Sequence, residues 1–372
     1  MSSSTTDTVA DTAARRDRLR ARLHTLEQPV EALVVTDLTN LRYLTGFTGS
    51  NGALLLSSAG AEGDVICTDG RYETQVAEQA GDLTAVIARD CPPELLRTAS
   101  AAGATAVGFE STALTVAAHS RLVAGAPDTQ LVATSGLVEK LREVKDPGEV
   151  ALLRRACTIA DEALATIIEA GVIRAGVTER AVARALEWEM YARGADAIAF
   201  ETIVAAGANS AIPHHRPTAD VLADGDLVKI DFGAVYGGYH SDMTRTYVLG
   251  GAADWQQEIY ELVATAQAEG RAALHPGADL RGVDDAARSV INDAGYGETY
   301  VHGLGHGVGL QIHEAPGIGK LATGTLPCGA AVTVEPGVYL PGRGGVRIED
   351  TLIVTDGEPD LLTTADKAFT VI

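Results

Sequence analysis

Five residues in the second half of the chain carry side chains that commonly bind metal ions. Four are carboxylates and one is an imidazole: Asp231, Asp242, His306, Glu335 and Glu349. Carboxylates gathered in a partly buried site repel one another, and a pair of bridging divalent cations is their natural counterweight. Oxygen-rich ligation with a single histidine suits Mn or Co, with Zn as an alternative, rather than the thiolate-rich sites of structural zinc. The five residues therefore predict a site for two divalent metal ions.

The first two carboxylates lie in a pattern that is typical of a β-hairpin. Apolar and β-branched residues over 228–233 predict a strand around Asp231, and a Gly-Gly turn at 237–238 precedes a second strand over 239–246. Neighbouring antiparallel strands can hold two carboxylates side by side. We therefore expect this hairpin to bring Asp231 and Asp242 together.

Two further strands are expected to carry the remaining carboxylates. The segment 333–339 reads as a strand that is broken by a Pro-Gly turn directly after Glu335, and 346–350 begins another strand. Alternation of side chains along that strand places Arg347 and Glu349 on one face. A single carboxylate in such a place is usually a turn former or a solvated side chain, so the prediction rests on the whole set.

The segments that contain these residues resemble the metallopeptidases of the pita-bread fold, which include methionine aminopeptidase, Xaa-Pro aminopeptidase and Xaa-Pro dipeptidase (prolidase). The matching segments follow the order of that family: IDFG (230–233), SDMTRT (241–246), HGLGHGVG (302–309), VEPG (334–337) and RIED (347–350). The resemblance covers nearly the whole chain. It implies that Asp242 and Glu349 bridge two metal ions. Asp231 would bind one of these ions, and His306 with Glu335 the other.

The histidines resemble those of the proline-specific branch of that family. The segment 207–218 is similar to a loop that carries a substrate-contacting histidine there, and His214 is the matching position. His215 adjoins it and stays an alternative for the same role. Further positions of the substrate pocket match at His302, His313 and Arg347. The resemblance implies hydrolysis of the Xaa-Pro bond, at the N-terminus of peptides or in dipeptides, with proline-containing peptides as binding partners and a homodimer as the assembly.

The expected mechanism is metal-assisted peptide hydrolysis. Two bound ions would lower the pKa of a water toward neutrality. Glu335 is the candidate to shuttle the proton, and His214 would help to stabilise the oxyanion of the tetrahedral intermediate. A creatinase-like amidinohydrolase and a non-catalytic binding protein of the same fold are the alternatives. Both are expected to lack metal ligands, whereas all five are present here. The choice between an aminopeptidase and a dipeptidase stays open.

Composition excludes several other classes of protein. The net charge of -21 and the pI near 4.7 argue against nucleic acid and anionic membranes as partners, because phosphate binding needs a basic face. Four scattered cysteines without a CxxC pair favour reduced thiols and a cytoplasmic location: Cys67, Cys91, Cys157 and Cys328. The chain shows neither an apolar run that could span a bilayer nor the apolar core of a signal peptide.

The chain of 372 residues is long for one core and predicts two domains. We expect an α/β domain over 1–143, because short apolar runs alternate with helical stretches and turns. Its segments 40–47 and 68–72 resemble the creatinase/prolidase-like N-terminal domain of bacterial Xaa-Pro peptidases. A pita-bread catalytic domain of the α+β class is expected over 144–372, beginning with a long helix near Glu149. Residues 1–10 are predicted to be disordered.

A weak internal repeat lies within the predicted catalytic domain. A glycine, a helix N-cap, a core position and a second glycine recur 101 residues later: Gly176, Thr178, Val182 and Gly194 correspond to Gly277, Asp279, Val283 and Gly295. Each copy would frame one amphipathic helix. A duplicated half-domain, related by a pseudo-two-fold axis with the site between the halves, is what the pita-bread resemblance implies.

Overall fold

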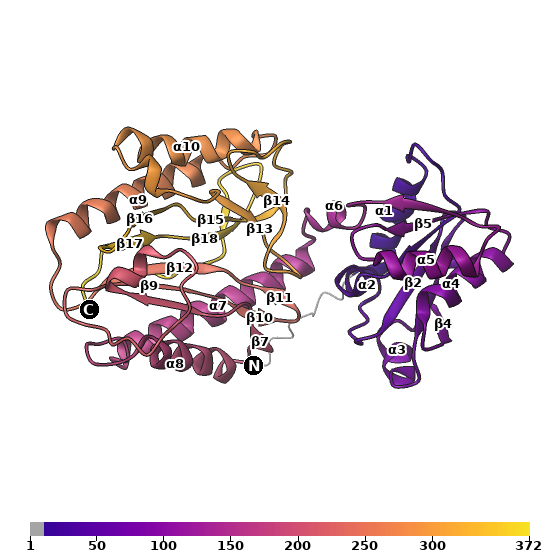
Figure 1. Ribbon diagram of the computed structural model, residues 1–372, viewed down its shortest axis with the longest axis horizontal. Coiled ribbons are helices and arrows are strands. Elements are labelled where there is room, and N and C mark those ends of the chain that lie inside the picture. The colour runs from indigo at the N-terminus through magenta and orange to yellow at the C-terminus, as the bar shows by residue number, and fades with distance from the viewer. Residues whose placement is uncertain (1–10) are drawn as a thin grey trace, which may run out of the picture. The chain divides into compact units, whose positions relative to one another are not determined.

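The computed structural model describes residues 11–372, so the predicted disorder of residues 1–10 lies outside the described residues. The chain divides into two compact units, an N-terminal unit that ends at Arg142 and a C-terminal unit over Glu143–Ile372 (Figure 1). Within residues 11–372, no helix combines the length and the apolar character needed to cross a membrane.

The N-terminal unit is built on a six-stranded sheet in the order β4-β3-β2-β1-β5-β6. Its strands are β1 (Ala32–Val35), β2 (Gly52–Ser57), β3 (Val65–Thr68), β4 (Thr84–Ile87), β5 (Ala106–Glu110) and β6 (Gln130–Thr134). Its helices are α1 (Thr12–Leu23), α2 (Leu38–Thr45), α3 (Glu73–Gln79), α4 (Cys91–Ala101), α5 (Val116–Gly125) and α6 (Glu139–Arg142). Strand β2 pairs antiparallel with both β1 and β3, and the other pairs are parallel. The alternation of strands and helices confirms the predicted α/β class of this region.

Four long helices frame the C-terminal unit: α7 (Pro147–Glu169), α8 (Glu179–Ala192), α9 (Asp254–Ala272) and α10 (Leu280–Asp293). Helix α7 begins two residues before the expected start near Glu149. Asp146 accepts a hydrogen bond from the Glu149 backbone, and the Glu149 carboxylate accepts one from the Asp146 backbone. This capping box, together with a proline that suits the first helical position, starts the helix at Pro147.

The strands of the C-terminal unit lie between the two helix pairs, with α7 and α8 on one side and α9 and α10 on the other (Figure 1). The first half contributes β7 (Ala197–Ile198), β8 (Ile203–Ala206), β9 (Leu227–Phe232), β10 (Ala234–Tyr236), β11 (Tyr239–His240) and β12 (Met243–Val248). The second half contributes β13 (Gly305–Gly307), β14 (Glu314–Ile318), β15 (Ala331–Val334), β16 (Gly337–Leu340), β17 (Gly344–Arg347), β18 (Asp350–Ile353) and β19 (Asp360–Leu361). One apolar core packs against α7 and α8, and a second packs against α9 and α10, where Leu227 and Val248 of the first half join residues of the second half.

The internal repeat appears in the structure as two matching helix starts. Thr178 caps α8 and Asp279 caps α10, each by accepting a hydrogen bond from a backbone N–H in the first turn. The glycines that precede the caps take positive φ angles of 84° and 82° at Gly176 and Gly277. Only glycine adopts this backbone conformation without strain, which explains why both copies of the repeat have a glycine two residues before the helix cap.

Two details of the predicted strands are wrong. The segment 346–350 is not one strand, because β17 ends at Arg347 and β18 begins at Asp350. Glu349 therefore lies in the bend between the two strands. Likewise, Asp231 pairs with Thr244 across β9 and β12, so Asp242 lies in the short connection before β12 rather than on a paired strand.

Candidate active site

A cavity of about 420 Å³ lies in the C-terminal unit, and it brings together every site residue that the sequence predicted. Its lining includes His214, Asp231, Asp242, His302, His306, His313, Glu335, Arg347 and Glu349. His215 lines the same cavity, as do the apolar side chains of Phe200, Ile203 and Ile312. The cavity thus joins a polar, carboxylate-rich floor to an apolar wall that could receive a ring-shaped side chain.

The predicted metal ligands converge at this floor. Ligand atoms of Asp242, His306 and Glu349 all lie within 4.8 Å of one another. His306 Nε2 is 3.3 Å from Glu335 Oε1 and 3.5 Å from Asp242 Oδ2. Asp231 accepts a short hydrogen bond from Arg347 on Oδ2, while its Oδ1 is buried without a hydrogen-bond partner. Four of the five residues thus have ligand atoms close to one another, and Asp231 lines the same cavity.

The electrostatics of the floor fit divalent cations. Burial, followed by the charge of neighbouring carboxylates, raises the pKa of both Asp242 and Glu349 well above its usual value. Burial alone would also raise the pKa of Glu335, but its hydrogen bond with His306 and nearby positive charge lower that pKa to about 2. Bound cations would relieve the repulsion and satisfy the unpartnered Asp231 oxygen. The residues present thus fit the metal site that the sequence predicted.

Glycines allow the ligand segments to approach one another closely. A Cβ atom at Gly233 would lie 1.9 Å from the Ser241 carbonyl oxygen, next to Asp242. A Cβ at Gly305 would lie 2.0 Å from the Thr333 carbonyl oxygen, so β13 can run tightly against β15 beside His306. Any larger residue at these positions would push the ligand-bearing segments apart.

Glu349 is held by groups that the sequence reasoning missed. Thr244 Oγ1 donates to Glu349 Oε2 at 2.7 Å and accepts from Arg347 Nε at 3.0 Å. The Arg245 guanidinium donates to the Glu349 carbonyl at 2.5 Å. Thr244 and Arg245 both lie in the matched SDMTRT segment, which is the one sequence signal that could have pointed to them.

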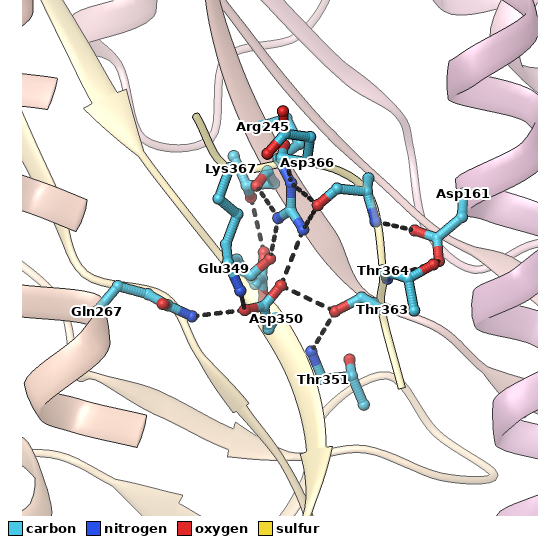
Figure 2. Close-up of polar contacts among 12 residues, drawn as sticks. Asp161, Arg245, Gln267, Glu349, Asp350, Thr351, Thr363, Thr364, Asp366 and Lys367 are labelled. Carbon is cyan, nitrogen blue, oxygen red and sulfur yellow. Dashed lines mark hydrogen bonds and ion pairs between the residues drawn. The ribbon is translucent and has the colours of Figure 1, made fainter. Parts of the chain in front are cut away.

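Asp350 is the centre of a buried polar network directly behind Glu349 (Figure 2). It accepts hydrogen bonds from Arg245 at 2.9 Å, from Gln267 at 2.8 Å and from Thr363 at 3.0 Å, and it pairs with Lys367. Burial opposes ionisation of Asp350, but the charges of Arg245 and Lys367 lower its pKa. The network fixes the bend that carries Glu349.

The substrate-side residues occupy different surroundings. His302 Nε2 lies 2.7 Å from the Tyr339 hydroxyl, and the His313 ring packs edge-on against the His306 ring at 4.5 Å between centroids. Burial lowers the pKa of both His302 and His313, which favours neutral imidazoles at neutral pH. Arg347 is buried, and it contacts Tyr339 as well as Asp231.

The two neighbouring histidines of the 207–218 loop differ in exposure. His214 is exposed where the loop borders the cavity, whereas His215 is buried and its Nε2 lies 2.7 Å from Glu179 Oε2. Glu179, the first residue of α8, was not predicted from the sequence to take part in the site. His215 is thus engaged by the fold, and His214 is the histidine that can reach a ligand.

A duplicated α+β unit with a carboxylate-rich metal site between its halves defines the class of pita-bread metallopeptidases. The chain belongs to metallopeptidase family M24, which matches residues 151–356, and residues 15–144 match the creatinase/prolidase N-terminal domain. The predicted family and fold class are confirmed, and the protein is a metallopeptidase.

Similar proteins with known sequences or structures agree with this membership. An uncharacterized peptidase of Bacillus subtilis, YqhT, is 37% identical over 352 residues, which cover 92% of this chain and 96% of that protein. The solved structure of Xaa-Pro dipeptidase from Bacillus anthracis superposes with a TM-score of 0.92 at 38% identity, covering 97% of this chain and all of the other. The solved structure of X-Pro aminopeptidase from Thermotoga maritima superposes with a TM-score of 0.87 at 31% identity. The match covers 96% of this chain and 99% of the other.

Proposed function

We propose that this protein hydrolyses the Xaa-Pro peptide bond, at the N-terminus of peptides or in dipeptides, with two divalent metal ions. The observation that carries the proposal is the convergence of five potential ligands and the candidate substrate histidines His214, His302 and His313 on one cavity. The names of the similar solved structures, a dipeptidase and an aminopeptidase that both act on Xaa-Pro substrates, support the same substrate class.

The proposed metal site uses the five ligand residues. Asp242 and Glu349 would help to hold both ions, Asp231 would help to hold one of them, and His306 with Glu335 would help to hold the other. Mn or Co suits this donor set best, with Zn as the alternative. When bound, such ions lower the pKa of a water and polarise the carbonyl of the scissile bond.

Side chains of the protein would transfer the proton, stabilise the oxyanion and orient the substrate. Glu335 takes a proton from the attacking water and returns it to the leaving nitrogen. His214 donates a hydrogen bond to the oxyanion that develops on the scissile carbonyl. The side chains that orient the substrate are His302, His313 and Arg347. Because a proline nitrogen carries no amide hydrogen, selectivity for it rests on the shape of the apolar wall and on this proton delivery.

The proposed setting is a homodimer in the cytoplasm. All four cysteines are free thiols, as is usual in a reducing compartment. The alternatives, a creatinase-like amidinohydrolase and a non-catalytic protein of the same fold, are disfavoured because the complete ligand set lines the cavity.

The decisive assay compares three kinds of peptide in the presence of Mn. An Xaa-Pro dipeptide and an Xaa-Pro-Yaa tripeptide test the proposed bond, and the matched Xaa-Ala peptides test its selectivity. We expect cleavage of at least one proline peptide well above its alanine counterpart, and the ratio of dipeptide to tripeptide turnover decides between a dipeptidase and an aminopeptidase. Equal cleavage of proline and alanine peptides, or cleavage of neither, would refute the proposal.

A further inference from the structure

Lys229 is a buried lysine that the proposed mechanism does not use. It lies on β9 two residues before Asp231 and is 0% exposed. Side chains alternate along a strand, so Lys229 and Asp231 share one face of β9. Val228 and Ile230, on the other face, pack in the apolar core of the first half. A lysine head group this deep in a protein is costly unless it has hydrogen-bond partners, so its partners indicate what it is for.

The hydrogen-bond partners of Lys229 are three backbone carbonyls of one short segment, and its head group also lies 5.0 Å from the centre of the Tyr339 ring. Its Nζ donates to the carbonyl oxygens of Ser210 at 3.1 Å, Ile212 at 2.7 Å and Pro213 at 3.3 Å. Carbonyl oxygens only accept hydrogen bonds, so the Lys229 head group is the donor in all three contacts. The segment they belong to ends directly before His214.

The other end of the His214 loop is fixed by a different residue. Glu179 accepts hydrogen bonds from the Thr218 backbone at 2.9 Å and from the Thr218 hydroxyl at 2.8 Å, in addition to its contact with His215. His214 itself is exposed between these two anchors. Its position in the cavity is therefore set by the backbone on either side rather than by partners of its own ring.

We propose that Lys229 is a positioning residue that sets the place of the His214 imidazole by fixing residues 210–213. The inference rests on the proposed role of His214 at the oxyanion. A hydrogen-bond donor stabilises a transition state only when it is held where the charge develops, and a displacement of about 1 Å can cost 100-fold in rate. Lys229 thus serves catalysis without touching the substrate.

The first test is Lys229→Met, which keeps an unbranched side chain and removes all three hydrogen bonds. We expect kcat for an Xaa-Pro peptide to fall about 10- to 100-fold with little change in KM, because the loss falls on the transition state. Metal content, measured by elemental analysis, should stay the same. Val228→Ala is the matched control, since it weakens the packing of the same strand from its opposite face and should leave kcat near that of the wild type.

The second test is a double-mutant cycle with His214→Ala. If Lys229 acts through His214, Lys229→Met should change kcat by less than about 2-fold once His214 is already alanine. Lys229→Arg, which retains donors, should keep more activity than Lys229→Met. If the methionine variant does not fold, Lys229→Arg replaces it in the double-mutant cycle with His214→Ala.

The outcomes separate this inference from the proposed function. A large kcat loss in His214→Ala with a full additional loss from Lys229→Met would overturn the positioning role alone. A loss of metal from Lys229→Met, or an equal kcat loss in Val228→Ala, would likewise overturn it. A fully active His214→Ala variant would instead remove the role of His214 in the proposed function, and the inference about Lys229 with it.

Discussion

His214 and His215 are neighbours in the sequence, yet the structure gives them opposite surroundings. We expect His214→Ala to leave metal content nearly unchanged and to lower kcat by about 100-fold, the usual scale for the loss of one transition-state hydrogen bond. His215→Ala should change kcat much less and mainly lower the stability of the protein, because it leaves buried Glu179 with one partner fewer. Elemental analysis, steady-state kinetics and thermal unfolding measure the three effects. Metal loss in His214→Ala, or the larger kcat defect in His215→Ala, would reverse the assignment.

Thr244 connects the proposed metal ligand Glu349 to the proposed substrate-side Arg347 through one hydroxyl. Thr244→Val keeps the shape of this fully buried side chain but removes its bonds to Glu349 and Arg347. Loss of such supporting bonds typically weakens metal binding 10- to 100-fold, so we expect a rise of about that size in the Kd for Mn, measured by titration calorimetry.

Thr202→Val provides a control for the loss of a buried hydroxyl. The Thr202 side chain is also buried, but its Oγ1 has no hydrogen-bond partner among the described residues. Its replacement should leave the Kd for Mn unchanged. An unchanged Kd in Thr244→Val as well would show that Glu349 does not depend on this hydroxyl.

The five proposed ligands could be identified as candidates from the sequence because each lies in a short segment with its own local pattern. Their supports could not be predicted in this way. Thr244 and Glu349 are 105 residues apart in the chain. Lys229 donates to backbone carbonyls, which every residue type carries, so the sequence does not mark them as its partners. Such contacts depend on how distant segments pack, which local patterns do not encode. The position of Glu349 shows the same limit, since alternation predicted a continuous strand and the packed chain bends there instead.

At the scale of elements, the N-terminus of α8 anchors the loop that follows β8. Glu179 is 0% exposed and accepts hydrogen bonds from the Ala206 backbone at 2.9 Å and from Asn209 at 3.0 Å, besides its bonds to Thr218 and His215. Burial alone would raise the pKa of Glu179, but these donors outweigh it and lower that pKa. The ionised carboxylate therefore stabilises the fold.

The lowered pKa of Glu179 predicts how the effect of Glu179→Gln depends on pH. A carboxylate with a lowered pKa contributes stability above its ordinary pKa of 4.5, and this contribution is lost as the pH falls through the folded-state value. We expect Glu179→Gln to lower the free energy of unfolding by about 1–3 kcal/mol near neutral pH. The difference from the wild type should shrink below about pH 4.5 in urea unfolding experiments. A difference that stays constant or grows on acidification would contradict this prediction.

At the scale of the whole molecule, the C-terminal unit places two of the proposed ligands in one half and three in the other. Asp231 and Asp242 precede α9, whereas His306, Glu335 and Glu349 follow it. The floor of the cavity is thus formed by residues of both halves of the C-terminal unit. The strands of these halves lie between α7/α8 and α9/α10 (Figure 1).

Metal removal should therefore affect stability as well as activity. An ion that binds only the folded state, at a concentration about 1,000-fold above its Kd, raises the free energy of unfolding by about 4 kcal/mol. For a unit of this size, that corresponds to a rise in Tm of about 10 °C. We expect exhaustive chelation to abolish peptidase activity and to lower Tm, and Mn or Co to restore both. Scanning calorimetry with parallel assays provides the measurement. Activity that survives chelation would refute the hydrolytic mechanism, and an unchanged Tm would show that the ions do not link the two halves.

The exposed connection between β12 and α9, residues 250–253, leads from one half of the ligand set to the other. A chain cut there would give two fragments, neither of which holds enough ligands for a complete centre. Their affinity for each other would then rise with the concentration of free Mn, because each re-formed complex gains the ions that neither fragment binds well alone. A split version of this unit would therefore act as a metal sensor, because association of the two fragments would report the concentration of free Mn.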